Sequence, residues 1–259
     1  MSSAPPRDIP PEIVYHPPDL PEDFGRGAVL PVDKPTGCTS FDVVRVVRRG
    51  TGQRKVGHAG TLDPMATGLL LLLVGRATKA SNFLTSQPKT YEGTLELGTT
   101  TDSQDADGQV LEQKPVPPLT EEDLATAFRS FLGDQYQLPP MFSAKKQKGV
   151  PLYKMARKGQ EVEREPRFVH IASFDLLALR LPEVDFRMEV SKGTYVRTVA
   201  HDLGQQLGCG AYLKRLRRTA IDDISVDGAV SLETLAEVPP SQLGRFLHPI
   251  HEFVPSHVL

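Results

Sequence analysis

The sequence has little that would support disulfide, metal or membrane chemistry. Its two cysteines, Cys38 and Cys209, lie far apart in unrelated contexts, so we expect free thiols in a reducing compartment. The longest apolar run, residues 68–74, is far too short to cross a bilayer. No basic region followed by an apolar stretch opens the chain, as it would in a secretory signal. We therefore expect a cytoplasmic protein. Its 259 residues suffice for one large domain or two small ones.

Positive charge is unevenly distributed along a chain whose net charge is only −2. Residues 45–55, 141–158 and 214–218 carry several lysines and arginines and no acidic residue, whereas residues 92–124 are strongly acidic. A single basic run is usually a solvated face, but three such runs can form one positive surface on a nearly neutral protein. The three runs are therefore candidates for contact with a polyanion.

The pattern of apolar residues predicts an α+β fold. Proline is so dense in residues 1–27 that we expect an extended arm there. Strands are predicted over residues 28–32, 69–74, 91–97, 169–181 and 184–190. Helices are predicted over residues 41–49, 77–84, 121–132, 150–158, 195–207 and 232–238, with Ser40 and Thr120 as the N-caps of the first and third. Because the two types are mixed without strict alternation, we expect a mainly antiparallel sheet and not a doubly wound fold.

Asp63 is the most informative residue of the chain. It stands before Pro64 on a glycine-rich turn that leads into five consecutive leucines. Asp-Pro alone usually marks an ordinary turn. Here Gly57, Gly60 and Gly68 permit tight backbone geometry and the close approach of a ligand. The surrounding residues contain no second carboxylate, no cysteine pair and no Gly-Lys-Ser/Thr, which argues against metal, redox or nucleoside-triphosphate chemistry. A buried strand can hold such a carboxylate rigidly at a surface.

Two residues near Asp63 have alternative interpretations. His58 would most often be structural, but on the same loop it could act as a stacking wedge or a base. Lys34, in the segment Lys34-Pro35-x-Gly37-x-Thr39-Ser40, could be a surface lysine, or it could support a loop or a phosphate.

Tyr195 and Arg197 fall at the start of a predicted helix. An arginine there opposes the helix dipole, so we expect it to answer a carboxylate, with Asp63 as a candidate. Such an arginine would keep the acid ionised and oriented. Residues 137–157 form a basic element that includes Tyr153, which suits a phosphate backbone but could also be an ordinary helix face.

Taken together, these segments resemble the bacterial tRNA pseudouridine synthases of the TruB family, which act on the T-loop uridine at position 55. The resemblance runs from about residue 28 to residue 249 in the family's order. The segments that carry it are residues 34–40, Gly57-His58-x-Gly60-Thr61-Leu62-Asp63-Pro64, Lys89-Thr90-Tyr91, residues 137–146 with the continuation Tyr153-x-x-Ala156-Arg157, residues 191–198 and Leu216-Arg217-Arg218.

The resemblance implies a central mixed, mainly antiparallel sheet with flanking helices. It also implies a role for each candidate residue. Asp63 matches the catalytic aspartate, and Arg197 matches the arginine paired with it. Tyr91 matches the tyrosine that stacks on the target base and is a proposed base for the proton at C5. Phenols are largely protonated at neutral pH, so stacking is the role that we favour. The resemblance further assigns substrate-binding roles, with Tyr195 and Leu216 around the flipped uridine, His58 filling the space left in the T-loop, and Lys34 beside them.

The implied reaction needs no metal and no cofactor. Isomerisation of uridine to pseudouridine breaks an N-glycosidic bond and makes a carbon–carbon bond, without redox change. The base must leave the stack, which requires an aromatic platform and a wedge. One anchored carboxylate could attack the sugar C1′, add to base C6, or assist elimination at C2′, and the sequence leaves all three open.

The domain organisation departs from the family pattern at both ends. Residues 28–249 match the pseudouridine synthase domain, and residues 250–259 form a tail too short for the C-terminal RNA-binding PUA domain of typical members. We expect a tRNA partner, through its T-stem-loop, and a monomer that needs no guide RNA and no membrane. Two other classes remain open: a tRNA-binding or tRNA-folding protein, and a glycosidase. The glycosidase is the weaker, because that chemistry usually requires two carboxylates.

Overall fold

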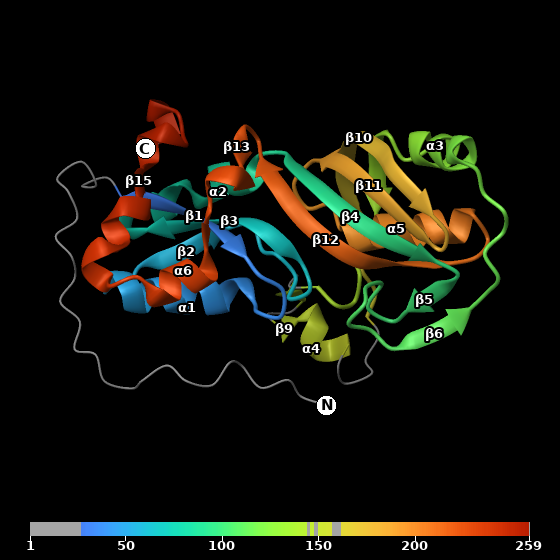
Figure 1. Cartoon of the computed structure of the whole chain (residues 1–259), viewed down its shortest axis with the longest axis horizontal. Coiled ribbons are helices and arrows are strands. Elements are labelled where there is room, and N and C mark those ends of the chain that lie inside the picture. Colours follow the sequence, from blue (N-terminus) through green and yellow to red (C-terminus); the bar gives the residue numbers. More distant parts are fainter. Residues whose placement is uncertain (1–26, 144–145, 148–149, 157–161, 259) are drawn as a thin grey trace. The chain divides into compact units, whose positions relative to one another are not determined.

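The computed structural model describes residues 27–143, 146–147, 150–156 and 162–258, and its contacts divide the chain into two units (Figure 1). The first unit comprises residues 1–87 and 218–259, and the second comprises residues 88–217. Almost all of the predicted N-terminal arm lies outside the described residues. Among the described residues, no helix has the length and apolar character needed to cross a bilayer.

The first unit is built on strand β3 (Thr67–Val74). Strand β1 (Ala28–Lys34) runs antiparallel to it, with Ala28 opposite Val74 and Lys34 opposite Gly68. The consecutive leucines of β3 are buried on both faces, as the sequence predicted for a fully buried strand. The other elements are β2 (Val56–Ala59), β13 (Ile224–Ser225), β14 (Val230–Ser231), β15 (His248–Pro249), α1 (Ser40–Thr51), α2 (Ser81–Ser86), α6 (Leu232–Glu237) and 3₁₀ turns at Gly75–Ala80, Val226–Gly228, Pro240–Phe246, Ile250–Glu252 and Ser256–Val258.

The first helix has a different cap from the predicted one. Thr39, and not Ser40, is the N-cap of α1, because its hydroxyl accepts from the Asp42 amide while the Asp42 carboxylate accepts from the Thr39 amide. Ser40 is the first helical residue, and its buried hydroxyl bonds the main chain of Leu62. The prediction was wrong by one residue because two adjacent hydroxyls both suit a cap. Thr120 is the N-cap of α3, as predicted.

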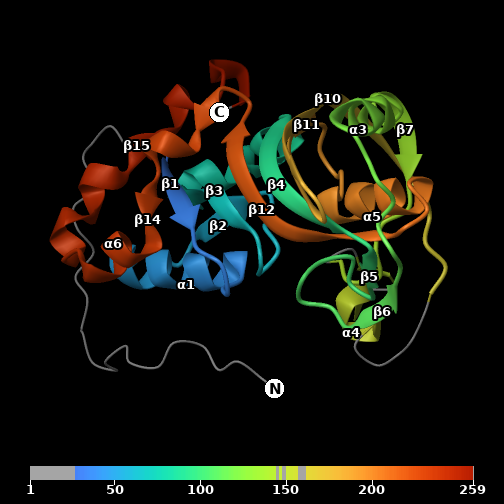
Figure 2. The ribbon, with the colours of Figure 1, turned by 45° about the vertical axis from the view of Figure 1, so that its right-hand side comes forward.

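The second unit is an antiparallel sheet with helices against one face (Figure 2). Its strand order is β12-β4-β11-β10-β7, and β12 continues into the first unit from residue 218. The bounds are β4 (Lys89–Leu97), β7 (Gly133–Gln137), β10 (Arg167–Arg180), β11 (Glu183–Val190), β12 (Ala211–Ile221), α3 (Glu121–Arg129) and α5 (Val196–Gln206), with smaller elements β5 (Thr99–Thr101), β6 (Val110–Gln113), β8 (Lys146–Gln147), β9 (Val150–Pro151) and α4 (Leu152–Ala156). The core includes a stack of Phe128 on Phe174, with ring centroids 3.8 Å apart.

Two predicted helices are shorter than expected. Helix α3 ends at Arg129, and after a short turn residues 133–137 form strand β7, which was not predicted. Strand β7 lies at the edge of the sheet, and Gln137 is its only buried residue. Because its residues are mostly polar, the sequence there lacks the alternation of apolar residues that predicts a strand. The helix predicted over residues 150–158 is observed as α4 alone, after the short strand β9; residues 157 and 158 lie outside the described residues. The mixed, mainly antiparallel α+β fold is as predicted.

Candidate active site

Asp63 lies in the first unit, on the turn between β2 and β3, and is partly exposed. The Ala66 amide donates to the Asp63 carbonyl at 3.1 Å, which closes the turn. Gly68 has φ +100°, and a Cβ there would lie 2.2 Å from the carbonyl oxygen of Arg218. Gly68 therefore permits a close approach of the chain to itself, and the close approach of a ligand stays a prediction.

Arg218 ties together the two ends of the Asp63 turn. Its side chain is buried; Nε donates to the Leu69 carbonyl at 2.7 Å, and Nη2 donates to the Gly60 carbonyl at 3.1 Å. In the sequence Arg218 looks like part of a basic run, and this role was not predicted. Nothing local could have revealed it, because the two acceptors lie far away in the sequence.

Lys34 supports the other side of the Asp63 turn. The residue is 0% exposed, and its Nζ donates to the carbonyls of Pro35, Cys38 and Pro64 at 2.8, 2.8 and 3.3 Å. Burial lowers the pKa of the Lys34 amine, and the nearby charges of Cys38 and Asp63 oppose part of that shift. Of the interpretations that the sequence left open, support of a loop fits these bonds, whereas a surface lysine does not.

Removing the Lys34 amine should destabilise the Asp63 turn. Lys34→Met removes a buried donor from three carbonyl groups, of which Pro64 keeps the Gly37 amide as a second donor, so we expect the free energy of unfolding to fall by about 1–3 kcal/mol. Lys55→Met, which removes an exposed amine from the same unit, should change it by less than about 0.5 kcal/mol. Urea unfolding of both variants measures the difference, and equal values would contradict the supporting role.

His58 lies on β2, opposite Leu72 of β3. Burial, with a smaller contribution from the positive charge of Arg218, lowers the pKa of its imidazole. The ring is therefore neutral at pH 7. Its buried Nδ1 has no hydrogen-bond partner among the described residues. A neutral, largely buried ring suits the predicted wedge, which stays a prediction.

The aromatic candidates lie in the second unit. Tyr91 is on β4 opposite Met188 and is buried except for 8% of its surface. Leu216 is equally buried on the neighbouring strand β12. Tyr195 is the N-cap residue of α5 and is partly exposed. These three residues come from two adjacent strands and one helix terminus of a single unit.

Arg197 is buried in the first turn of α5, and it pairs with a carboxylate, as predicted. Its Nη1 lies 3.4 Å from Oδ2 of Asp105, and both side chains are less than a tenth exposed. The same Nη1 donates to the Ser103 carbonyl, and Nη2 donates to the Phe142 carbonyl, both at 2.8 Å. Asp63 belongs to the other unit, so its predicted pairing with Arg197 stays a prediction.

Asp105 lies within the acidic stretch 92–124, and its role was not predicted. Residues 102–109 form an acidic loop after β5. The structure places this loop against β12 and α5. The Ala106 amide donates to the Leu213 carbonyl at 3.1 Å, and the Leu213 amide donates to the Gln104 carbonyl at 3.0 Å. The Gln104 side chain accepts from the hydroxyl of Thr198 at 2.9 Å. The loop thus fixes Asp105 beside Arg197.

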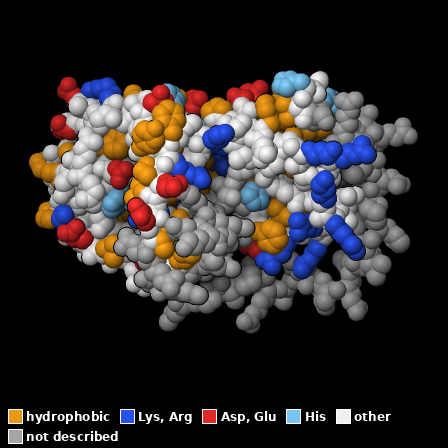
Figure 3. Space-filling model, turned by 180° about the vertical axis from the view of Figure 1, so that it is seen from behind, with side chains coloured by type: hydrophobic (Ala, Val, Ile, Leu, Met, Phe, Trp, Pro, Cys, Tyr) orange, Lys and Arg blue, Asp and Glu red, His pale blue; other side chains and the backbone are white. Residues whose placement is uncertain are grey.

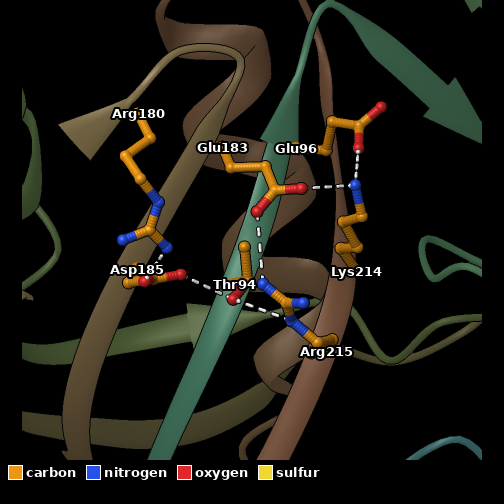
Figure 4. Close-up of polar contacts among 7 residues, drawn as sticks. All are labelled: Thr94, Glu96, Arg180, Glu183, Asp185, Lys214 and Arg215. Atoms are coloured by element: carbon orange, nitrogen blue, oxygen red, sulfur yellow. Dashed lines mark hydrogen bonds and ion pairs between the residues drawn. The ribbon is translucent and has the colours of Figure 1, made fainter. Parts of the chain in front are cut away.

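Two residues of the basic run 214–218, Lys214 and Arg215, pair with acidic residues of neighbouring strands (Figure 4). Nζ of Lys214 lies 2.6 Å from carboxylate oxygens of both Glu96 and Glu183, and hydrogen bonds to these two acids raise its pKa. Arg215 reaches Glu183 at 3.2 Å. Arg218 is buried as well, but the side chain of Arg215 is 63% exposed, so only part of this run is withdrawn from the basic surface that the sequence suggested.

The basic run 45–55 is different, because Arg49, Arg54 and Lys55 are exposed. The Gly75 amide donates to the Lys55 carbonyl at 2.8 Å, which brings the exposed Arg76 close to this group. Lysine and arginine side chains gather over the first unit in Figure 3. None of the basic side chains of the run 141–158 is among those that the structure describes. Among the described residues, no cluster of His, Cys, Asp and Glu is arranged to hold a metal ion.

Two family models together cover most of the chain. Residues 48–196 match the N-terminal domain of TruB family pseudouridylate synthases, and residues 197–254 match the C-terminal domain of tRNA pseudouridylate synthase B. The boundary between these models falls inside the second structural unit. It also lies within the single domain, residues 28–249, that the sequence predicted.

Curated relatives and solved structures agree with the family models. The tRNA pseudouridine synthase B of Opitutus terrae is 57% identical over 89% of this chain and 95% of its own length. The tRNA pseudouridine synthase B of Syntrophotalea carbinolica is 46% identical over 86% of this chain and 73% of its own length. A Cbf5-Nop10-Gar1 complex shares the fold, with a TM-score of 0.68 and 24% identity over 88% of this chain and 61% of the other. An H/ACA RNP bound to a substrate RNA gives a TM-score of 0.65 and 22% identity over 87% of this chain and 60% of the other. The chain therefore belongs to the TruB family of pseudouridylate synthases.

Proposed function

We propose that this chain isomerises uridine to pseudouridine at position 55 in the T-loop of tRNA, acting as a monomer without guide RNA or cofactor. The observation that carries the proposal is the construction of the Asp63 turn. Buried donors from Lys34 and Arg218, together with the Ser40 hydroxyl, bind the main chain on both sides of one partly exposed carboxylate. The name of the relatives, tRNA pseudouridine synthase B, indicates that the substrate is tRNA.

In this proposal the target uridine leaves the T-loop, and His58 fills the space that it vacates. Tyr91 stacks on the flipped base, and Leu216 and Tyr195 line its pocket. Asp63 reacts at C1′ or C6 or assists loss of the C2′ proton, so that the bond between C1′ and N1 of the base breaks. The base then rotates and bonds to C1′ through C5. The C5 proton passes to a base, for which Tyr91 is a candidate, and N1 gains a proton, so the product is an isomer of the substrate. Arg197 holds its side of the pocket in place through Ser103, Asp105 and Phe142.

The test is incubation of the purified chain with an unmodified tRNA transcript, without added metal, cofactor or other protein. Pseudouridine is mapped by chemical modification and primer extension. Product confined to the T-loop uridine supports the enzyme, and it also shows that neither guide RNA nor a partner protein is required. Tight tRNA binding without product would favour the RNA-binding alternative instead.

The salt dependence of tRNA binding should distinguish the exposed basic residues from the paired ones. If Arg54 and Lys55 contact phosphates, Arg54→Gln and Lys55→Gln should each reduce the slope of log K against log salt by about one. Lys214→Gln changes the charge equally but removes an amine already paired with Glu96 and Glu183, so its slope should match the wild type. Filter binding over a range of salt concentrations measures all three, and identical slopes throughout would place Arg54 and Lys55 away from the RNA.

A further inference from the structure

The N-terminus of α5 is held by a side chain from β7. Tyr195, the N-cap residue, provides no side-chain cap for this helix. Instead, Gln137 binds the backbone of Tyr195 on both sides: its Oε1 accepts from the Tyr195 amide at 2.7 Å, and its Nε2 donates to the Tyr195 carbonyl at 3.1 Å. Gln137 is only 6% exposed. One buried side-chain amide therefore reproduces the paired hydrogen bonds of a β-bridge.

The segment that begins at Gln137 touches the same helix turn a second time. Five residues further on, the Phe142 carbonyl accepts from Nη2 of Arg197 at 2.8 Å. Between the two contacts, Pro139 and Pro140 are buried, and their rings restrict the backbone. Residues 137–142 thus hold Tyr195 through its main chain and Arg197 through its side chain.

We propose that Gln137 is a positioning residue for pseudouridine formation. By fixing the backbone at Tyr195, it sets the direction of the Tyr195 ring and the start of the helix turn that carries Arg197. It acts through these two residues and does not itself touch the reacting atoms. The inference rests on the proposed function, because its effect is on the rate of that reaction.

A glutamate at this position separates the two hydrogen bonds. An ionised carboxylate can still accept from the Tyr195 amide, but it cannot donate to the Tyr195 carbonyl, and two acceptor oxygens are then forced together. A protonated carboxyl group again offers one donor and one acceptor, as the wild-type amide does. The low exposure of the site raises the pKa of such a carboxyl group, which brings its protonation into an accessible pH range.

The experiment compares Gln137→Glu with Gln135→Glu in single-turnover assays on tRNA transcript. Gln135 lies two residues earlier on β7, and its Nε2 donates to the Phe131 carbonyl at 2.6 Å, so its substitution also costs a hydrogen bond but leaves α5 untouched. At pH 8 we expect Gln137→Glu to be slower than wild type by about tenfold, with tRNA affinity changed less than about threefold. Gln135→Glu should keep the wild-type rate.

The pH profile supplies a readout that a general loss of stability would not give. Relative to wild type, Gln137→Glu should regain activity as the pH is lowered from 8 to 5.5, while the ratio for Gln135→Glu stays flat. If Gln137→Glu does not fold, Gln137→Met replaces it, and we expect the same loss of rate at all pH values. Equal rates for the position-137 and position-135 variants would overturn the inference. Absence of product from the wild type would instead contradict the proposed function, and the inference with it.

Discussion

Asp63→Asn should lose pseudouridine formation by at least about a thousandfold, the scale seen when a reacting group is removed from an active site. Asparagine has nearly the same shape but cannot supply a carboxylate to C1′, C6 or the C2′ proton. The hydrogen bonds that fix the turn run to the main chain of Gly60, Leu62 and Pro64. The folded shape of the turn should therefore survive the substitution, and tRNA affinity should remain within a few-fold of wild type.

The measurement is a single-turnover assay with the wild type, Asp63→Asn and Asp223→Asn. Asp223 is exposed and lies in the same unit, so its substitution makes the same change of charge away from the turn. Urea unfolding and filter binding accompany the assay, so that a loss of rate is not confused with a loss of structure or of RNA. Full turnover by Asp63→Asn would remove Asp63 from the reaction.

The sequence predicted what depends on residues close together along the chain. The buried strand β3 follows from a short run of leucines, and the cap at Thr120 follows from the acids after it. Asp63 could be selected because its glycines and its apolar strand are immediate neighbours. The cap at Ser40 failed by one residue for the same local reason, since neighbouring hydroxyls compete for one role.

What the sequence did not predict depends on contacts across long separations. Arg218 looked like part of a basic run, and its bonds to Gly60 and Leu69 exist only after the sheet has formed. Lys214 is neutralised by acids on two other strands, which no charge count along the chain can show. Gln137 belongs to a motif of the resemblance, but its two bonds to Tyr195 required the fold.

A second large effect, on stability and on turnover, is expected from substitution of Arg197, the buried arginine of the second unit. Arg197→Met leaves the Asp105 carboxylate and the carbonyls of Ser103 and Phe142 without this donor in a buried site. Loss of one partner from a buried charge pair typically costs about 3–5 kcal/mol, because the remaining charge is uncompensated. We expect a loss of that size in the free energy of unfolding, and turnover should fall with it because α5 and the acidic loop lose their common anchor.

Coupling between Arg197 and Asp105 should be visible in a double-mutant cycle. Arg197→Met leaves the Asp105 carboxylate buried without its counter-ion, and Asp105→Asn removes that charge. The double variant should therefore lose less free energy of unfolding than the two single variants lose together. Arg187→Met, at an exposed position on β11, is the matched control and should change stability by less than about 0.5 kcal/mol. If Arg197→Met were no more destabilising than Arg187→Met, the arginine would not anchor this side of the pocket. Its effect on turnover would then have to arise at the substrate itself.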